Sequence, residues 1–240
     1  SYNGVETGQN LQDKRSPKQL IDEAVELAKS VDHVVFIGGL NKSEKQDCEG
    51  ADRTQLALPY NQNSVIEALA DATNNLTVVL ISGNAVEMPW LNKVESVVQA
   101  WYLGSEAGNA IARILAGEVN PSGKLPFTFG AKLKDYPAHA DGATFPNPKK
   151  VYYFVGYRGF EKRGTKPLFA FGHGLSYTKF EYSDLRLSSN EIYHDAEHGN
   201  DTLTVTLTVT NSGDRAGKEV VQLYIADSKS SLPRPKKELK

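Results

Sequence analysis

The stretch VVFIGGLNKSEKQDCEGADR, residues 34–53, decides how the chain is organised. It opens with the apolar run Val34 to Ile37, which has the composition of a buried strand, and two glycines break this run. Three carboxylates and one arginine then fall within residues 46–53, and Pro59 leads into a helical pattern. The charged segment is therefore expected to be a loop at the carboxyl end of a strand, where α/β proteins place their chemistry.

Helical and strand patterns alternate around this stretch. Ser16-Pro17 combines an N-cap residue with proline at the first helical position, and an apolar stripe runs from Leu20 to Ala28. Further along, the patterns predict a helix at 64–73, an all-apolar strand at 76–81, a short helical piece at 90–94, a strand at 96–101 and a helix at 106–116. All-apolar strands are typical of parallel sheets that are covered on both faces. The alternation predicts an α/β fold with a doubly wound sheet.

The pattern changes in the second half of the chain. Residues 124–129 alternate as in an edge strand, and 132–150 are rich in proline, lysine and small residues, which indicates a long surface connection. After Phe180 the apolar period becomes two, in runs around 185–187, 203–209 and 221–225. This period is typical of an antiparallel β-sandwich. Three strands cannot close a seven-stranded sandwich, so the sandwich is expected to be truncated.

The composition limits the classes of partner. A hydrophobic content of 40% supports a real core, and the formal charge of −2 gives no reason to expect a nucleic acid or an anionic membrane as partner. The single cysteine, Cys48, rules out an internal disulfide framework, and its acidic neighbours argue against a low-pKa nucleophilic thiol. No apolar run reaches transmembrane length, and the first residues show no secretory signal pattern.

Six motifs, read in order, resemble those of glycoside hydrolase family three, the β-glucosidase and β-xylosidase group. The resemblance runs from about the first strand to Lys240, and the ordered series is much more specific than any single motif. The motifs are EGADR at 49–53, SGN at 82–84, AWYLGSEAG at 100–108, NPSGKLP at 120–126, VGYR at 155–158 and PLFAFGHGLSY at 167–177. The chain is thus identified as resembling the C-terminal portion of such an enzyme.

The resemblance implies a domain organisation. Residues 1–130 correspond to an α/β sandwich domain, 131–180 to a linker that wraps between domains, and 181–240 to an incomplete fibronectin type III-like domain. It also implies a retaining, exo-acting β-glycosidase whose nucleophile is an aspartate on an N-terminal (β/α)-barrel of the same parent protein. The substrate would be a β-linked oligosaccharide or glycoside, with glucose as the favoured sugar and no cofactor. A secreted or periplasmic location fits the family, and a homodimer remains open.

The carboxylates of the loop are the candidates for catalysis. Glycoside hydrolysis needs a protonated and an ionised carboxyl group, about 5 Å apart in retaining enzymes. Glu49 with Glu44, Asp47 or Asp52 could supply this pair within the loop. The resemblance instead makes Glu49 the general acid/base and places the nucleophile outside the chain. Asp52 and Arg53 are then interpreted as a local ion pair that holds the loop, Asp47 as a supporting residue, and Glu44 as a solvated acid at the loop tip.

Other features of the sequence favour structural roles. Glu106 stands at a strand-to-helix junction, where a carboxylate offsets the helix dipole, and Trp101 and Tyr102 are interpreted as core aromatics rather than sugar platforms. His173 belongs to no cluster with metal-ligand spacing, so no metal site is expected. The stretch GGLNKS at 38–43 lacks the order of a phosphate loop, and the sequence contains no Gly-x-Ser-x-Gly elbow.

Two functions from different classes remain at this stage. The first is the C-terminal part of a β-glycosidase, which supplies the acid/base glutamate. The second is a non-catalytic α/β module with a sandwich appendage, which binds carbohydrate or a protein partner. A doubly wound nucleotide-binding domain is a distant third, because the phosphate loop is missing. The first two are distinguished by whether the parent protein carries a barrel with an aspartate at a strand end.

Overall fold

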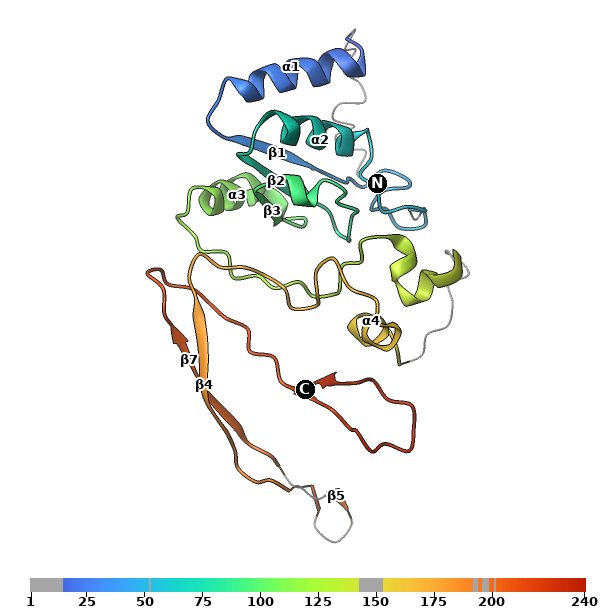
Figure 1. Ribbon diagram of the computed structural model, residues 1–240, viewed down its shortest axis with the longest axis vertical. Helices are drawn as coiled ribbons and strands as arrows, with labels where there is room; N and C mark the ends of the chain where they lie inside the picture. Colours follow the sequence, from blue (N-terminus) through green and yellow to red (C-terminus); the bar gives the residue numbers. More distant parts are fainter. Residues whose placement is uncertain (1–14, 52, 143–152, 192–193, 196–198, 201) are drawn as a thin grey trace.

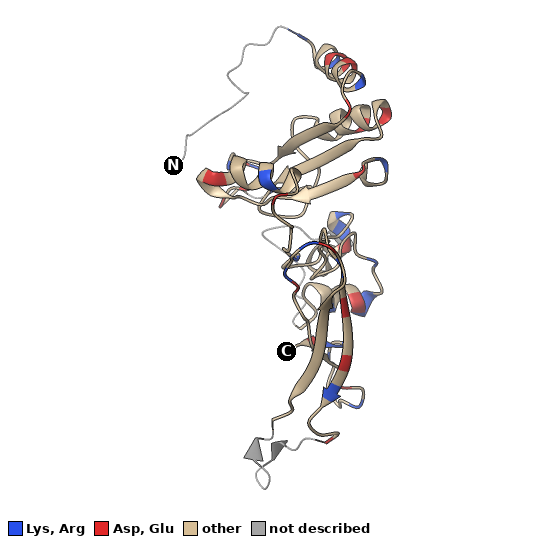
Figure 2. Ribbon diagram, turned by 90° about the vertical axis from the view of Figure 1, so that its left-hand side faces the viewer, with Lys and Arg blue, Asp and Glu red and all other residues tan. Residues whose placement is uncertain are grey.

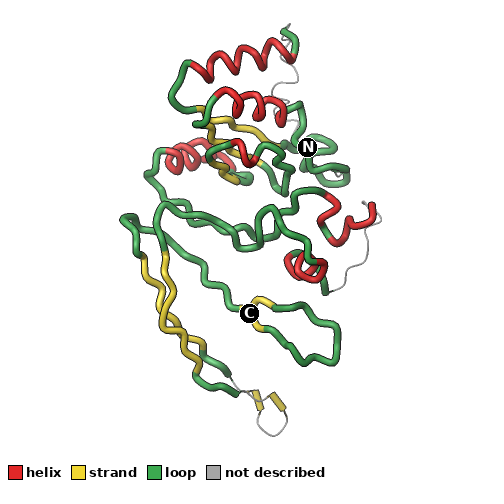
Figure 3. Tube along the Cα trace, in the orientation of Figure 1, coloured by secondary structure: helices red, strands yellow, loops and turns green. Residues whose placement is uncertain are grey.

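The computed structural model describes residues 15–51, 53–142, 153–191, 194–195, 199–200 and 202–240. A small sheet with helices on both faces forms the upper part of Figure 1, and a long antiparallel strand pair forms the lower left. Long loops join the two parts, as the tube in Figure 3 makes clear. Basic and acidic residues are interspersed along the elements of both parts in Figure 2.

The upper sheet is parallel and has the order β1-β2-β3. Its strands are β1 (Val34–Gly39), β2 (Leu76–Ile81) and β3 (Ser96–Gln99). In the register of the sheet, Val34 lies opposite Leu76 and Thr77 lies opposite Ser96. The carboxyl ends of all three strands therefore meet at one edge, and the loop of residues 40–53 leaves β1 at this edge. The expected α/β arrangement, a parallel sheet with helices on both faces, is present over these strands.

Helices cover both faces of the sheet because the central strand is apolar on both. On one face, Leu76, Val78 and Leu80 of β2 pack with buried residues of α1 (Pro17–Lys29) and α2 (Gln62–Ala72). On the other face, Val79 packs with Ile111 of α3 (Ala107–Leu115). The side chains of β2 alternate between these two clusters, and all three of the first set have no exposed surface. This explains why β2 is apolar at every position except Thr77, whose buried hydroxyl bonds to Ser96 at 2.9 Å.

The helix boundaries follow from local signals. Ser16 caps α1 with a complete capping box. The Ser16 hydroxyl accepts from the backbone N–H of Gln19, and the Gln19 side-chain oxygen accepts from the backbone N–H of Ser16. Gly117 stands in the left-handed conformation just after α3, at φ 71°. Short 3-10 helices accompany these elements, namely η1 (Leu91–Lys93), η2 (Gly104–Glu106), η3 (Leu133–Asp135) and η4 (Pro137–Gly142). The sequence patterns thus locate α1, α2, η1 and α3 to within a few residues, whereas η3 and η4 lie in the segment that was expected to be a surface connection.

The expected edge strand at 124–129 is wrong. Only one isolated bridge, Phe129 with Phe169, forms there in the described chain. Backbone hydrogen bonds join Leu125 to residues 172 and 173, and Phe129 to residues 168 and 169, but they do not form a continuous ladder among the described residues. Phe127 and Phe129 instead stack on each other and pack on Trp101, with centroids 5.2 to 6.2 Å apart. The alternating pattern reflects this aromatic cluster.

The C-terminal part contains a helix and small antiparallel sheets. The elements are α4 (Tyr157–Arg163), β4 (Phe180–Leu187), β5 (His194–Asp195), β6 (Gly199–Asn200), β7 (Val205–Asn211), β8 (Tyr224–Ile225) and β9 (Glu238–Leu239). β4 pairs with β7, β5 with β6, and β8 with β9. The run at 221–225 therefore does not join the sheet of β7, because its last two residues pair with Glu238 and Leu239 instead. Antiparallel strands are present as expected, and a sandwich is not formed among the described residues.

The described helices include none that is both long and apolar enough to cross a membrane. The longest of them, α1, has 13 residues.

Candidate active site

The loop after β1 begins at a tightly fixed strand end. Gly39 has φ 138°, and an added Cβ there would collide with the carbonyl of Ile81 on the neighbouring strand. The side chain of Gln62 bonds to both backbone groups of Gly39, accepting from its N–H at 2.8 Å and donating to its carbonyl at 2.9 Å. This amide completes the open edge of β1 and sets the direction in which the loop leaves the sheet.

Asp47 ties the loop to the carboxyl ends of β2 and β3. Its Oδ2 accepts a hydrogen bond from the backbone N–H of Gly83 at 2.6 Å and from the phenol of Tyr102 at 2.9 Å. Gly83 follows β2, in a turn where Ser82 donates to the carbonyl of Asn84, and Tyr102 follows β3. The Asp47 side chain is only 9% exposed. One buried carboxylate thus joins three segments at the same sheet edge.

Arg53 holds the far end of the loop. Its Nη2 donates to the carbonyl of Ala85 at 2.9 Å and lies 3.9 Å from Oδ1 of Asp47. Burial lowers the pKa of the Arg53 guanidinium from its ordinary value, and the neighbouring Asp47 carboxylate opposes this shift. Nη1 of Arg53 is buried and has no hydrogen-bond partner within the described part of the chain.

A second anchor fixes the middle of the loop. The Gln46 amide accepts from the backbone N–H of Asn41 at 3.0 Å and donates to the Tyr60 hydroxyl at 2.8 Å. The loop also closes on itself through the N–H of Lys45, which donates to the carbonyl of Ala51 at 2.9 Å. Glu49 lies between these anchored positions and is exposed, as is Gly50 beside it. Glu49 is therefore held on a fixed loop with its side chain in solvent.

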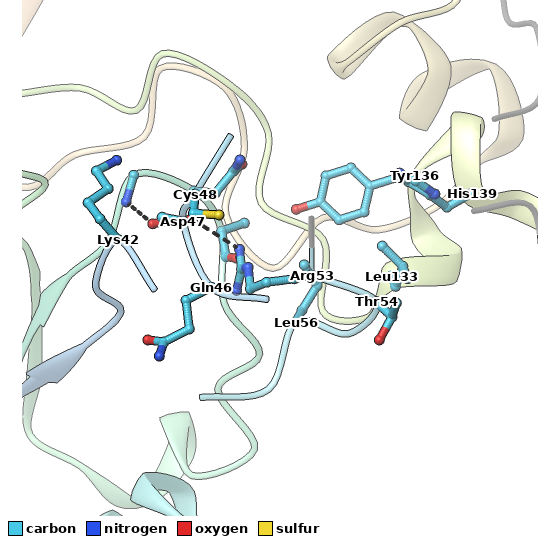
Figure 4. A pocket seen from close by; sticks show the side chains of 13 residues that line it. Lys42, Gln46, Asp47, Cys48, Arg53, Thr54, Leu56, Leu133, Tyr136 and His139 are labelled. Atoms are coloured by element: carbon cyan, nitrogen blue, oxygen red, sulfur yellow. Dashed lines mark hydrogen bonds and ion pairs between the residues drawn. The ribbon is translucent and has the colours of Figure 1, made fainter. Parts of the chain in front are cut away.

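A cavity of about 540 Å³ opens beside this loop. In Figure 4, Asp47 and Cys48 lie on one side of it, Tyr136 and His139 on the other, and Arg53 between them. Tyr136 comes from the segment after η3, and its hydroxyl accepts from the N–H of Gly130 at 2.9 Å. Burial raises the pKa of the Tyr136 phenol above its ordinary value. The lining is mixed in polarity, as in many ligand and interface cavities.

The structure brings together some of the residues expected from the sequence. Glu49, Asp47 and Arg53 share the loop, and the ion-pair partner of Arg53 in the described structure is Asp47. Asp52 lies outside the described residues. Glu44 is exposed at the tip of the loop, as expected. Because Asp47 is buried and engaged by two donors, it is unsuited to act as the second carboxyl group of a catalytic pair.

Tyr102 is the residue that sequence reasoning placed wrongly. It was expected in the core with Trp101, and Trp101 does pack on Phe127 and Phe129. The Tyr102 side chain instead faces the loop, where its hydroxyl bonds to Asp47, a residue 55 positions earlier in the sequence. The Lys42 ammonium lies 4.3 Å from the centroid of the Tyr102 ring. Burial first, and then the hydrogen bond to Asp47, raise the pKa of Tyr102. The only local signal for this role is its place directly after a strand that ends at the loop edge.

The described residues contain no group of three or more His, Cys, Asp or Glu side chains that could hold a metal ion. The loop presents an exposed carboxyl group, that of Glu49, beside the buried pair of Asp47 and Arg53.

Comparison with known proteins identifies relatives over almost the whole chain. A family model described as the glycosyl hydrolase family 3 C-terminal domain matches residues 3–177. A β-glucosidase of Bacteroides ovatus is 48% identical over 227 residues, which are 92% of this chain and 30% of the relative. The thermostable β-glucosidase B of Acetivibrio thermocellus is 46% identical over 97% of this chain and 30% of its own length.

Solved structures agree with the sequence relatives. A β-glucosidase of Streptomyces venezuelae in complex with D-glucose superposes with a TM-score of 0.80 at 40% identity, over 92% of this chain and 28% of that one. A family 3 β-glucosidase of Bifidobacterium adolescentis gives a TM-score of 0.81 at 34% identity, over 95% of this chain and 33% of that one. The chain thus spans about a third or less of the length of these relatives.

Proposed function

The chain belongs to glycosyl hydrolase family 3, whose C-terminal domain it contains, and on this basis we propose that it is the C-terminal part of a retaining, exo-acting β-glucosidase. Its contribution to the reaction is the general acid/base, Glu49. The observation that carries this proposal is the exposed position of Glu49 on a loop whose neighbours on both sides are anchored to the sheet edge.

The chemistry assigns one carboxyl group to this chain and one to another part of the parent. A retaining enzyme uses a nucleophilic carboxylate to form a glycosyl-enzyme intermediate, while the second carboxyl group protonates the leaving oxygen and later activates water. Asp47 is committed to its hydrogen bonds, which supports a nucleophile outside the chain. We place it on an N-terminal (β/α)-barrel of the same parent. Glu49 is exposed in this chain and would reach the sugar when the barrel lies against the loop edge.

The proposal extends to the domain organisation and the substrate. Residues 1–130 are assigned to the α/β sandwich domain, 131–180 to the linker and 181–240 to the start of a fibronectin type III-like domain. The antiparallel pair β4–β7 supports the last assignment. The substrate class is β-linked glucosides, since the relatives compared here are named β-glucosidases. The Asp52–Arg53 part of the loop is assigned a supporting role beside Asp47.

The test compares two leaving groups in the full-length parent enzyme. General acid catalysis contributes on the order of a hundred- to ten-thousandfold, and the contribution is largest when the departing alcohol is a poor leaving group. Glu49→Ala should therefore lose far more rate on cellobiose than on a dinitrophenyl β-glucoside. Added azide should restore turnover of the activated substrate and yield a β-glucosyl azide.

Glu44→Ala is the matched control, because Glu44 is an exposed glutamate on the same loop. It should show neither the leaving-group effect nor azide rescue. If Glu44→Ala shows both and Glu49→Ala retains activity on cellobiose, the acid/base assignment is wrong. The chain of residues 1–240 alone should not hydrolyse aryl β-glucosides. If this chain turns over an aryl β-glucoside faster than its Glu49→Gln variant does, the proposal that the nucleophile lies outside residues 1–240 is wrong.

A further inference from the structure

We propose that Tyr102 is a positioning residue for the acid/base, acting through Asp47 to fix the loop that carries Glu49. This inference rests on the proposed role of Glu49. It adds a residue from the segment that follows β3, far from Glu49 in the sequence. The phenol does not need to touch the substrate, because it acts on the loop through its hydrogen bond to the Asp47 carboxylate.

The Asp47 carboxylate is the connecting group. Its Oδ2 receives two hydrogen bonds, one from the Gly83 backbone at 2.6 Å and one from the Tyr102 hydroxyl at 2.9 Å. Hydrogen bonds to an ionised carboxylate are shorter and stronger than those between neutral groups. Asp47 also donates its own backbone N–H to the carbonyl of Asn41 at 3.0 Å, at the start of the loop. Both the side chain and the backbone of Asp47 are therefore fixed, two residues before Glu49.

The backbone before Tyr102 is shaped to aim its ring at the loop. Trp101 has φ 59°, a left-handed conformation that is uncommon for a bulky residue. Such conformations cost free energy and persist where the surrounding structure over-determines them. Here the indole of Trp101 packs on Phe127 and Phe129, with centroids 5.7 and 6.2 Å away. The inward anchoring of Trp101 leaves Tyr102 on the outside of the turn, facing Asp47.

Tyr102 is 38% exposed, and side chains of the loop contact the remainder of its ring. The Lys42 ammonium lies 4.3 Å from the ring centroid. A Cβ added at Gly83 would lie 3.0 Å from Cε2 of Tyr102 and 3.3 Å from Oδ2 of Asp47, so glycine is the residue that fits there without a shift. A phenol keeps its proton at neutral pH, and burial together with the Asp47 carboxylate raises the pKa of Tyr102 further, so its hydroxyl remains a donor. Of the two donors to Oδ2, it is the one that a conservative substitution removes.

The loop then transmits the position of Asp47 to Glu49. Displacement of a catalytic group by about 1 Å costs on the order of a hundredfold in rate. Loss of one of the two donors leaves the Gly83 bond in place, so we expect a partial displacement. The effect should appear only in the step that uses the acid, which separates positioning from a general loss of stability.

The experiment uses the full-length parent enzyme and the same two substrates. Tyr102→Phe should lower kcat/KM on cellobiose about tenfold, a smaller loss than removal of the acid itself causes. The kcat/KM on a dinitrophenyl β-glucoside should stay within about twofold of the unmodified enzyme. Tyr177→Phe is the matched control, because the Tyr177 phenol also donates one hydrogen bond, to the carbonyl of Ile114 at 3.0 Å, away from the loop. The Tyr177→Phe variant should have unchanged kcat/KM on both substrates.

A double variant shows whether Tyr102 acts through Glu49. In a Glu49→Ala background, Tyr102→Phe should cause no further loss on cellobiose, because residues that act as one unit are not additive. A further tenfold loss would overturn the proposal, as would equal losses on the two substrates or no loss on either for Tyr102→Phe alone. If the Tyr102→Phe enzyme does not fold, Asp47→Asn decides the question, since it should show the same selective loss on cellobiose.

The outcomes separate this inference from the proposed function. If Glu49→Ala lacks the leaving-group effect, the acid/base assignment of Glu49 is wrong, and the positioning role of Tyr102 is then wrong as well. If Glu49→Ala shows the effect and Tyr102→Phe and Asp47→Asn do not, only the positioning role fails.

Discussion

The indole N–H of Trp90 donates to the side-chain oxygen of Asn63 at 2.9 Å, and Trp90 has no exposed surface. This bond joins the segment before β3 to the first turn of α2. Asn63→Ala leaves the buried indole donor without a partner, which costs about 1 to 3 kcal/mol. We expect the free energy of unfolding of the chain, measured in urea, to fall by this amount. Asn109→Ala, which removes only an exposed bond to Glu106, should change it by less than about 0.5 kcal/mol.

Leu80 and Leu185 differ in what surrounds them. Leu80 is fully buried in the central strand, whereas Leu185 in β4 is 70% exposed. Truncation of a buried leucine to alanine removes apolar contacts and leaves a cavity, at a cost of about 2 to 5 kcal/mol. Leu80→Ala should lower the free energy of unfolding by that amount, and Leu185→Ala by less than about 0.5 kcal/mol. Similar losses for the two variants would mean that β4 is covered in solution.

Hydrogen exchange should divide the chain into two regions. The amides of β2 are bonded in a sheet with neighbours on both sides, so their exchange requires opening of the α/β core. β7 pairs with β4 alone, and much of that pair is exposed. We expect slow exchange in 78–81 and fast exchange in 203–225. Equal protection of both regions, together with a doubled mass in solution, would identify a homodimer that covers the strand pair.

The elements that the sequence predicts well are those with local causes. The capping box of Ser16 and Gln19 involves residues three positions apart, and the apolar run of β2 carries its own burial pattern. Both are readable before any tertiary contact is known. The expected strand at 124–129 failed because its phenylalanines pack on Trp101, a residue that lies more than twenty positions earlier.

The candidate site shows the same division. Glu49, Asp47 and Arg53 fall in one short segment, so the sequence alone assembles them. Tyr102 meets Asp47 only through the register of the parallel sheet, which brings the ends of β2 and β3 to the loop. The left-handed Trp101 that turns Tyr102 outward has no signature in the sequence. Likewise, the pairing of Tyr224 with Leu239 depends on a return of the chain that periodicity does not encode.

His173 predicts a pH dependence of stability. Its ring stacks on Phe169 with centroids 5.0 Å apart, and burial, followed by the charge of Lys124, lowers its pKa from the ordinary value of 6.5. Between the lowered pKa and 6.5, the unfolded chain binds more protons than the folded chain. The stabilising effect is therefore complete above 6.5 and is lost as the pH falls through the lowered pKa.

Melting temperatures of the chain at about pH 7.5 and about pH 5.5 measure this effect. His173→Gln should melt with a smaller difference between the two conditions than the unmodified chain does. Because the His173 ring is only partly buried and water screens its charge, the change in this difference should be small. An unchanged difference would assign the acid sensitivity of the chain to other groups.

Arg53 supports a last prediction, which separates its charge from its geometry. The guanidinium reaches two partners at once, the carbonyl of Ala85 at 2.9 Å and the Asp47 carboxylate at 3.9 Å. A lysine keeps the charge beside Asp47, but its ammonium ends one bond short of the guanidinium Nη2 that makes both contacts. In the parent enzyme, Arg53→Lys should therefore loosen the far end of the loop and lower kcat/KM on cellobiose about tenfold, with a smaller loss on a dinitrophenyl β-glucoside.

Arg113→Lys is the control, because it alters only an exposed pair with Glu118, and it should change neither rate. Full activity of Arg53→Lys on cellobiose would show that charge beside Asp47 is sufficient, and that the bond to Ala85 does not hold Glu49 in place.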